Sequence, residues 1–210
     1  MAISGGLRLL VYDRTCSGRP VGLTTALSSG SVLYRGLGRL DGAAGVASWA
    51  EALGWLASFR ASEPVQEIQY WGHGRWGRAL VDRDELSSEA LRPGHPLAPK
   101  LEAVRERLVP GGEALLWLRT CEAFGARAGQ DFAARLADYF GARVAGHTHV
   151  IGVLQSGLRG LRPGHAPDWS AEEGLAEGTA EAPRRAHDSS PLRPRTVHFL
   201  TGRVPPSWFA

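Results

Sequence analysis

The sequence Gly111-Gly-Glu-Ala-Leu-Leu-Trp-Leu-Arg-Thr-Cys121-Glu-Ala-Phe-Gly125 carries the clearest structural signal in this chain. Residues 114–118 are a short apolar run that follows a Gly-Gly turn. The run is too short for a helix of ordinary length, so it predicts a buried strand. Open α/β sheets carry their chemistry just beyond the carboxyl ends of their strands. We therefore expect the Cys121 thiol at such an end, where a nucleophile would lie.

A second predicted strand, residues 67–71, is followed directly by Gly72-His73-Gly74. If the two strands are parallel neighbours, His73 and Cys121 emerge at the same edge of one sheet. Cysteine attacks as the thiolate, and a nearby imidazole either lowers the thiol pKa or carries the proton of the leaving group. The two side chains together are the minimum set for a thiol hydrolase.

Strands and helices alternate along the first two thirds of the chain. Residues 7–12 predict the first strand, and Arg143 begins a strand that ends at Gly146-His147-Thr148. Apolar residues recur at helical intervals over 46–56, 97–108 and 130–140. This alternation predicts an α/β fold, a three-layer sandwich with a mostly parallel sheet and helices on both faces.

The remaining segments give weaker patterns. Residues 16–42 are rich in Gly, Ser and Thr, with a strand expected only at 31–34. Proline and glycine punctuate the chain after residue 162. We expect one α/β domain over 1–170, a mobile Pro/Gly/Ala-rich segment over 171–195, and a C-terminal strand or tail over 196–210.

Composition narrows the class of protein. Of 210 residues, 43% are hydrophobic and 21% charged, which is ordinary for a soluble globular protein. The net charge is only +3 and the arginines are scattered, so we expect no nucleic-acid partner. The two cysteines, Cys16 and Cys121, are too few for a disulfide scaffold and favour a cytoplasmic protein. No charged leader precedes the short run at 7–12, so we also expect no membrane partner.

The order of these features resembles a known group. A strand ending in His-Gly, then a helix, then a strand ending in Cys is similar to the caspase-like cysteine peptidases, which include gingipains, legumains, separases and the CHAT domains. The resemblance covers residues 7–151 in outline. Residues 108–146 are closer still to a bacterial caspase-like domain of uncharacterised function. The positions that carry this closer match are Gly111-Gly112, Leu115-Leu116, Cys121, Gly125, Gly129, Phe132, Leu136-Ala137, Gly141-Ala142 and Val144-Ala145.

The resemblance implies a role for each site residue. Cys121 would be the nucleophile and His73 the general acid and base. The backbone N–H groups of Gly74 and Cys121 would hold the carbonyl oxyanion, as preorganised donors do in acyl transfer. A protein or peptide substrate would be cut through a thioester acyl-enzyme, with neither a cofactor nor a metal ion.

Substrate preference is less defined, because Thr120-Cys121-Glu122 departs from the Gln-Ala-Cys-Arg-Gly signature of animal caspases. Aspartate specificity is therefore not implied. In the wider group, the end of the first strand and the segment after the cysteine often line the S1 pocket. Asp13 or Glu122 in that place would favour Arg or Lys at P1, whereas Arg14 would favour an acidic residue. We expect a basic P1.

Three further residues are expected at the substrate cleft. His147 would lie at its rim, and Gln155 and Ser156 would contact the substrate strand, by analogy with the family. Gly146-His147-Thr148-His149 also resembles the final motif of calcineurin-like metallophosphoesterases. That family needs an early Asp-x-His, a Gly-Asp and a Gly-Asn-His to hold two metals, and this chain has none of them. A third alternative is a caspase-like domain that no longer cuts and serves as an interaction module. The sequence leaves the oligomeric state open.

Overall fold

A computed structural model of the protein describes residues 5–16 and 22–209. Its centre is a six-stranded sheet in the order β10-β8-β7-β3-β1-β2. All neighbouring strands are parallel except β10, which runs antiparallel to β8. The strands are β1 (Leu7–Asp13), β2 (Gly42–Val46), β3 (Val65–Trp71), β7 (Leu115–Arg119), β8 (Arg143–His147) and β10 (Leu158–Leu161). The prediction of an α/β fold with a mostly parallel sheet is confirmed.

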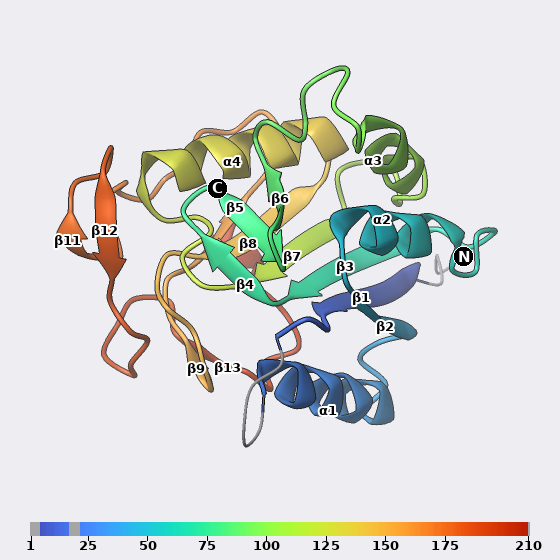
Figure 1. Ribbon diagram of the computed structural model, residues 1–210, viewed down its shortest axis with the longest axis horizontal. Coiled ribbons are helices and arrows are strands. Elements are labelled where there is room, and N and C mark those ends of the chain that lie inside the picture. The colour runs from blue at the N-terminus through green and yellow to red at the C-terminus, as the bar shows by residue number, and fades with distance from the viewer. Residues whose placement is uncertain (1–4, 17–21, 210) are drawn as a thin grey trace.

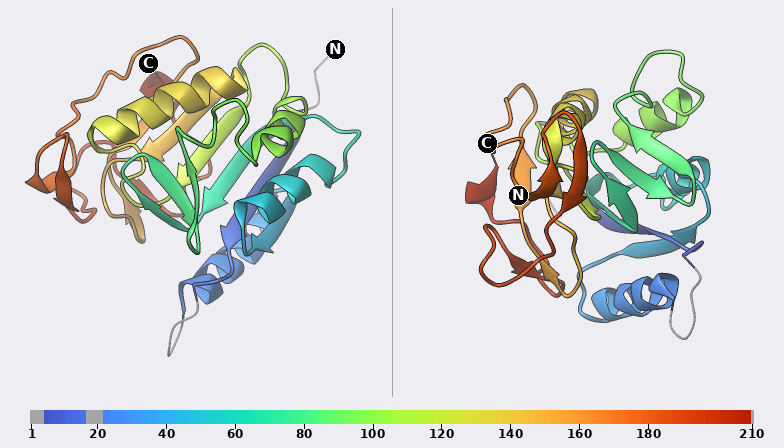
Figure 2. Two further views of the ribbon diagram at one scale, coloured as in Figure 1. Left: turned by 45° about the horizontal axis from the view of Figure 1, so that its top comes forward. Right: turned by 60° about the vertical axis from the view of Figure 1, so that its left-hand side comes forward.

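Helices cover both faces of this sheet. Figure 1 and Figure 2 place α2 (Trp49–Ser58), α3 (Ala98–Arg105) and α4 (Ala126–Phe140) on one face and α1 (Leu23–Gly36) on the other. Side chains alternate along each strand, so each strand serves both layers. Leu9 belongs to the core beneath α2, α3 and α4, whereas its neighbour Leu10 packs against α1.

The chain after β10 completes the α1 face. Trp117 on β7 and Leu158 on β10 pack against Val197 and Val204 from the C-terminal segment. Within that segment, β13 (Val197–His198) pairs antiparallel with β9 (Leu154–Gln155), and a 3-10 turn, η1, follows at Pro206–Trp208. The expected late strand therefore exists, although it pairs with β9 and not with the main sheet.

Two predictions of secondary structure are wrong. Residues 31–34 are part of helix α1 and not a strand; residues 17–21 of the same stretch lie outside the described residues. Residues 171–195 contain a hairpin of β11 (Leu175–Gly178) and β12 (Pro183–Ala186) instead of irregular chain. Ala186 of this hairpin is buried in a cluster with Trp76 and Ala126.

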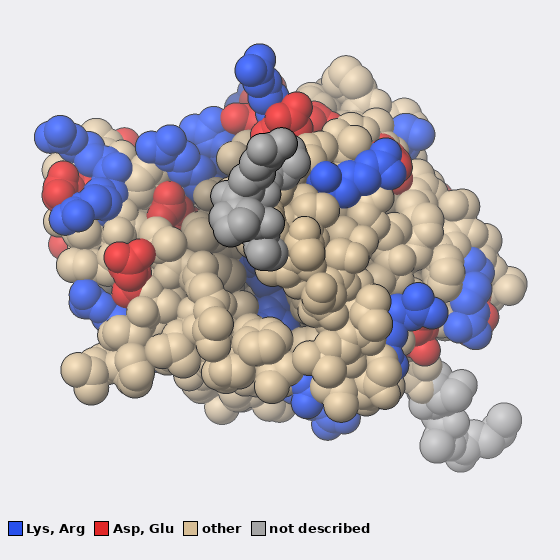
Figure 3. Space-filling view, turned by 60° about the horizontal axis from the view of Figure 1, so that its bottom comes forward, with Lys and Arg blue, Asp and Glu red and all other residues tan. Residues whose placement is uncertain are grey.

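A smaller sheet and the surface charges complete the picture. β4 (His73–Arg75), β5 (Arg78–Val81) and β6 (Asp84–Ser87) form a three-stranded antiparallel sheet that leaves the end of β3. On the face in Figure 3, basic and acidic side chains are interspersed and do not gather in one basic stripe. None of the helices in the described ranges has the length and apolar character needed to cross a membrane.

Candidate active site

His73 and Cys121 follow the carboxyl ends of two adjacent strands of the main sheet. β3 and β7 are parallel neighbours, and Trp71 is paired with Arg119 at the last position of the ladder. His73 follows β3 at the start of β4, and Cys121 lies two residues beyond the end of β7. The sequence analysis required that the two strands be parallel neighbours, and they are, so both residues follow the carboxyl ends of adjacent strands. His73 is exposed and Cys121 is partly buried.

Close steric contacts require glycine on both sides of His73. A Cβ at position 74 would lie 2.4 Å from the Thr120 Oγ1 and 2.7 Å from the Cys121 carbonyl oxygen. A Cβ at position 72 would lie 2.2 Å from the Tyr70 hydroxyl. The backbone of β4 therefore rests directly on the Thr120–Cys121 turn, which fixes His73 relative to the thiol.

This contact gives a first prediction. Gly74→Ala should lower the free energy of unfolding by about 1–3 kcal/mol, because the added methyl group overlaps backbone and a buried side chain. Gly54→Ala in α2 is the matched control, since its Cβ would meet nothing closer than 3.9 Å, and alanine is the better helix former. Urea unfolding of both variants measures the difference. Equal stability of the two variants would contradict the contact of β4 with Thr120–Cys121.

The Cys121 thiol is partly buried next to the backbone of Ile151. The Ile151 N–H points at the sulfur across 3.5 Å, and the Ile151 carbonyl oxygen is 3.9 Å from it. Burial raises the pKa of the Cys121 thiol, the charges of Glu122 and Asp188 raise it further, and the Ile151 N–H opposes them. Among the described residues, no hydrogen bond joins the Cys121 sulfur to the His73 ring. The resting thiol is therefore protonated at neutral pH.

The chain turns sharply after Cys121. Glu122 has a left-handed backbone (φ 41°), and its N–H donates to the His149 carbonyl at 3.0 Å. Burial raises the pKa of the Glu122 carboxyl, while the positive charge of Arg75 on β4 lowers it. Ala126 repeats the left-handed conformation at the start of α4 (φ 60°). The turn leaves a half-buried carboxylate next to the thiol and facing a cation.

Asp13 is fully buried at the end of β1. Its Oδ1 accepts from the N–H and the hydroxyl of Thr15 at 2.7 and 2.6 Å. Its Oδ2 lies 3.1 Å from the Cys16 sulfur and 3.3 Å from the Asp82 nitrogen. Burial alone would raise the pKa of Asp13, and these hydrogen bonds outweigh it, so the net shift is downward. Both carboxylate oxygens are therefore already used in holding the chain after β1.

A second prediction follows for Asp13. Asp13→Asn should cost about 1–3 kcal/mol at pH 7, because the amide NH₂ would face buried donors. The folded-state pKa lies below the ordinary value of 3.8, so this stabilisation is present above about pH 4. It is lost as the pH falls through the lower folded-state pKa. Urea unfolding between pH 2 and 7 should therefore show the stability of the two proteins converging at low pH. A constant difference down to pH 2 would contradict the assignment.

The other predicted substrate residues do not meet at one cleft. Arg14 is exposed and turns towards α2, where it pairs with Glu51 at 3.1 Å. His147, Gln155 and Ser156 are buried, with 0%, 6% and 0% of their surface exposed. They therefore do not have the exposure that direct contact with a substrate needs in this conformation.

These three buried residues belong to a network of polar contacts that also includes Arg119 at the end of β7 and Thr196. The His147 Nδ1 lies 3.1 Å from the Ser156 carbonyl oxygen, and burial lowers the pKa of His147 to about 3, so the ring is neutral. The Ser156 hydroxyl is 2.7 Å from the Thr196 hydroxyl. The Gln155 side-chain oxygen accepts two hydrogen bonds from Arg119, at 3.0 and 2.8 Å. The network ties the segment after β8 to the C-terminal segment.

Sequence reasoning did not select Arg119, although it lies two residues before Cys121. Its guanidinium is buried, with 5% of the residue exposed, at the carboxyl end of β7. The sequence did contain a signal for Arg119, since it is a charged residue at the end of an otherwise apolar strand. An arginine is rarely buried unless it has polar partners, so this position could have been expected to make specific contacts.

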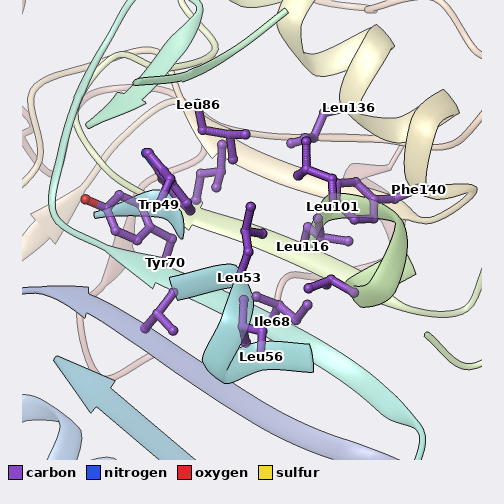
Figure 4. Close-up of a pocket in the computed structure, with 13 residues that line it drawn as sticks. Trp49, Leu53, Leu56, Ile68, Tyr70, Leu86, Leu101, Leu116, Leu136 and Phe140 are labelled. Atoms are coloured by element: carbon purple, nitrogen blue, oxygen red, sulfur yellow. The ribbon is translucent and has the colours of Figure 1, made fainter. Parts of the chain in front are cut away.

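An apolar cavity in the core lies apart from this site. A cavity of about 30 Å³ lies in the core between the sheet and helices α2, α3 and α4, and apolar side chains point into it (Figure 4). It contains neither Cys121 nor His73. Within the described ranges, no three His, Cys, Asp or Glu side chains are grouped so that they could hold a metal ion. The structure thus adds no support for the phosphoesterase alternative.

Comparison with known proteins adds no relative. No protein-family model matches the chain, and neither a curated protein nor a solved structure matches it.

Proposed function

We propose that this protein is a caspase-like cysteine endopeptidase with Cys121 as the nucleophile and His73 as the general acid and base. The observation that carries the proposal is the parallel pairing of β3 with β7, which brings both residues to one end of one sheet. The contact of Gly74 with the Thr120–Cys121 turn supports it further, since it holds the histidine strand against the cysteine.

The raised pKa of Cys121 favours one form of the mechanism. His73 takes the thiol proton as the sulfur attacks the substrate carbonyl, so no thiolate needs to exist beforehand. The N–H groups of Gly74 and Cys121 hold the oxyanion. The protonated His73 then gives its proton to the leaving amine as the C–N bond breaks, which leaves a thioester on Cys121. Water attacks this thioester, again with His73 taking a proton, and the acid product leaves with the thiol restored.

A basic residue at P1 remains part of the proposal. Asp13 has both oxygens occupied and Arg14 is paired with Glu51, so Glu122 would carry the preference. The charge of Arg75 next to Glu122 works against such a preference. A fluorogenic peptide library varied at P1, with the Cys121→Ala protein as the blank, tests both hydrolysis and specificity.

A second candidate is a caspase-like domain that binds partners without cutting them. The protonated resting thiol and the missing hydrogen bond between Cys121 and His73 favour this alternative. The rate of iodoacetamide labelling at Cys121 discriminates between the two. For the peptidase, labelling at pH 7 to 8 should become slower in His73→Ala. An unchanged rate, no faster than that of a model thiol, would indicate the binding module.

A further inference from the structure

Arg119 is a buried cation that makes no direct ion pair within the described ranges, although the charge of Glu67 on β3 acts on it from a distance. Its Nη1 donates to the Tyr34 hydroxyl at 2.7 Å and its Nη2 to the Phe199 carbonyl at 2.5 Å, in addition to its two bonds to Gln155. The rings of Trp117, Trp71 and Tyr34 surround the guanidinium, with centroids 4.5, 5.3 and 5.5 Å from its carbon. Within the described ranges, Arg119 makes no ion pair with a carboxylate.

The arginine is covered by the chain's own C-terminal residues, which we call the strap (residues 197–202). The strap enters as β13, paired with β9, and the Phe199 N–H donates to the Val153 carbonyl at 2.8 Å. Successive strap carbonyls then meet donors from the rest of the protein. The Phe199 carbonyl accepts from Arg119 and Tyr34, the Leu200 carbonyl accepts from Arg39, and the Gly202 carbonyl accepts from Arg8.

This arrangement has the features of a peptide complex within one chain. Val197 and His198 add as a short strand to β9, as peptides do in strand addition. The chain then turns, with the Thr201 N–H donating to the His198 carbonyl at 2.7 Å, and the carbonyls that follow His198 are received by a row of donors. The donors that form the row are Arg119, Tyr34, Arg39 and Arg8.

We propose that β9 and these donors form a peptide-binding groove, and that the strap is its resting occupant and keeps it closed to other peptides. The incoming ligand is an extended peptide with an acidic side chain. A carboxylate would give Arg119 the charged, bidentate partner that guanidinium geometry favours and that the strap does not supply. The acidic side chain would bind at Arg119, which precedes Cys121 in the sequence, and not at Glu122, which follows it.

The groove and the candidate active site share one loop. The Ile151 N–H points at the Cys121 sulfur, and the Val153 carbonyl accepts the strap amide. Arg119 itself is on the strand that delivers Cys121. Displacement of the strap would therefore open the surface next to the thiol. Regulation of the thiol by the strap rests on the proposed peptidase function, whereas the binding of an acidic peptide in the groove does not.

The experiment measures binding in the Cys121→Ala background, so that no hydrolysis is needed. The probes are two fluorescein-labelled Thr/Val-rich nonapeptides that differ only in a central Glu or Gln, followed by fluorescence anisotropy. Phe199→Pro removes the strap amide that bonds to Val153. It should tighten binding of the Glu peptide about tenfold, because apparent affinity rises with the open fraction. The gain for the Gln peptide should be smaller.

Two control variants sharpen the test. Leu192→Ala changes a side chain that is 96% exposed and lies outside the strap, so this variant should bind the Glu peptide as the parent does. Adding Arg119→Met should abolish the preference for Glu over Gln. Equal affinity of the parent and Phe199→Pro proteins, or no preference for Glu in either, would overturn the proposal.

A second measurement covers the case in which Phe199→Pro does not fold. In the parent protein, an excess of the Glu peptide should accelerate hydrogen exchange at the Phe199 amide, and the Gln peptide should not. No acceleration would overturn the groove. Binding of the Glu peptide, together with no hydrolysis of any peptide in the P1-varied library by the native protein, would leave the groove standing and overturn the peptidase. Hydrolysis of library peptides, with no effect of the strap variants, would support the peptidase and overturn the groove.

Discussion

Replacement of Cys121 by alanine should reduce kcat for peptide hydrolysis by a factor on the order of 10⁴ to 10⁶, because the covalent route through the thioester is lost. His73→Ala should reduce kcat by about 10² to 10⁴, which is the usual contribution of a general acid and base. Because the thiol is protonated at rest, His73→Ala should regain activity as the pH is raised towards the pKa of the thiol. Steady-state kinetics between pH 6 and 10 on the best library peptide measure both effects.

The chain offers a matched control for each variant. Cys16 follows β1 at the same sheet edge and is the other free cysteine among the described residues, so Cys16→Ala should retain kcat. His165 is exposed and distant in sequence from the site, and His165→Ala should also be active. Loss of activity in Cys16→Ala but not in Cys121→Ala would refute the assignment of the nucleophile.

Arg119→Ala should be the most destabilising single change to a charged residue in this protein, with a loss on the order of 3–5 kcal/mol. The Gln155 oxygen would be left buried without its donor, and the Tyr34 hydroxyl and the Phe199 carbonyl would each lose one of their hydrogen bonds. The cage of three aromatic rings would also lose the group it packs around. Such a loss is a large part of the 5–15 kcal/mol that typically stabilises a domain.

The matched control for this prediction is Arg127→Ala. Arg127 pairs with Glu181 at 3.2 Å, but both side chains are more than two thirds exposed. Surface pairs of this kind contribute no more than about 1 kcal/mol. Thermal and urea unfolding of both variants give the comparison. A loss at Arg119 as small as that at Arg127 would mean that the strap leaves or rearranges easily, with water replacing the guanidinium.

The sequence predicted the strands that carry the candidate site because their patterns are local. Strand β7 is a short apolar run after Gly111-Gly112, and β3 ends in the β-type residues Ile68 to Trp71 before Gly72. Gly141 ends α4 in the left-handed conformation (φ 57°). The edge strand β2 was missed because its sequence, Gly-Ala-Ala-Gly-Val, has no alternating pattern. Helix α1 was missed because Ser31 occupies a buried position between Leu27 and Tyr34 and hides the helical period.

The predicted substrate residues were misplaced for a different reason. Sequence order indicated that Gln155 and Ser156 follow the last parallel strand, but not that a distant segment would cover them. Gln155 pairs with Val197 of the C-terminal segment. No local sequence pattern encodes such a long-range pairing. Arg119 was passed over because its three polar partners come from α1, β9 and the strap.

The adjacency of β3 and β7 also has a meaning for folding. Residues 72–114 separate the two strands in the chain, so the histidine and the cysteine meet only after a non-local pairing has formed. In an unfolded chain Cys121 would be an ordinary, accessible thiol, whereas in the native state it is partly buried with a raised pKa. Trapping of this one sulfur by an alkylating reagent during refolding would thus time the closure of the central sheet.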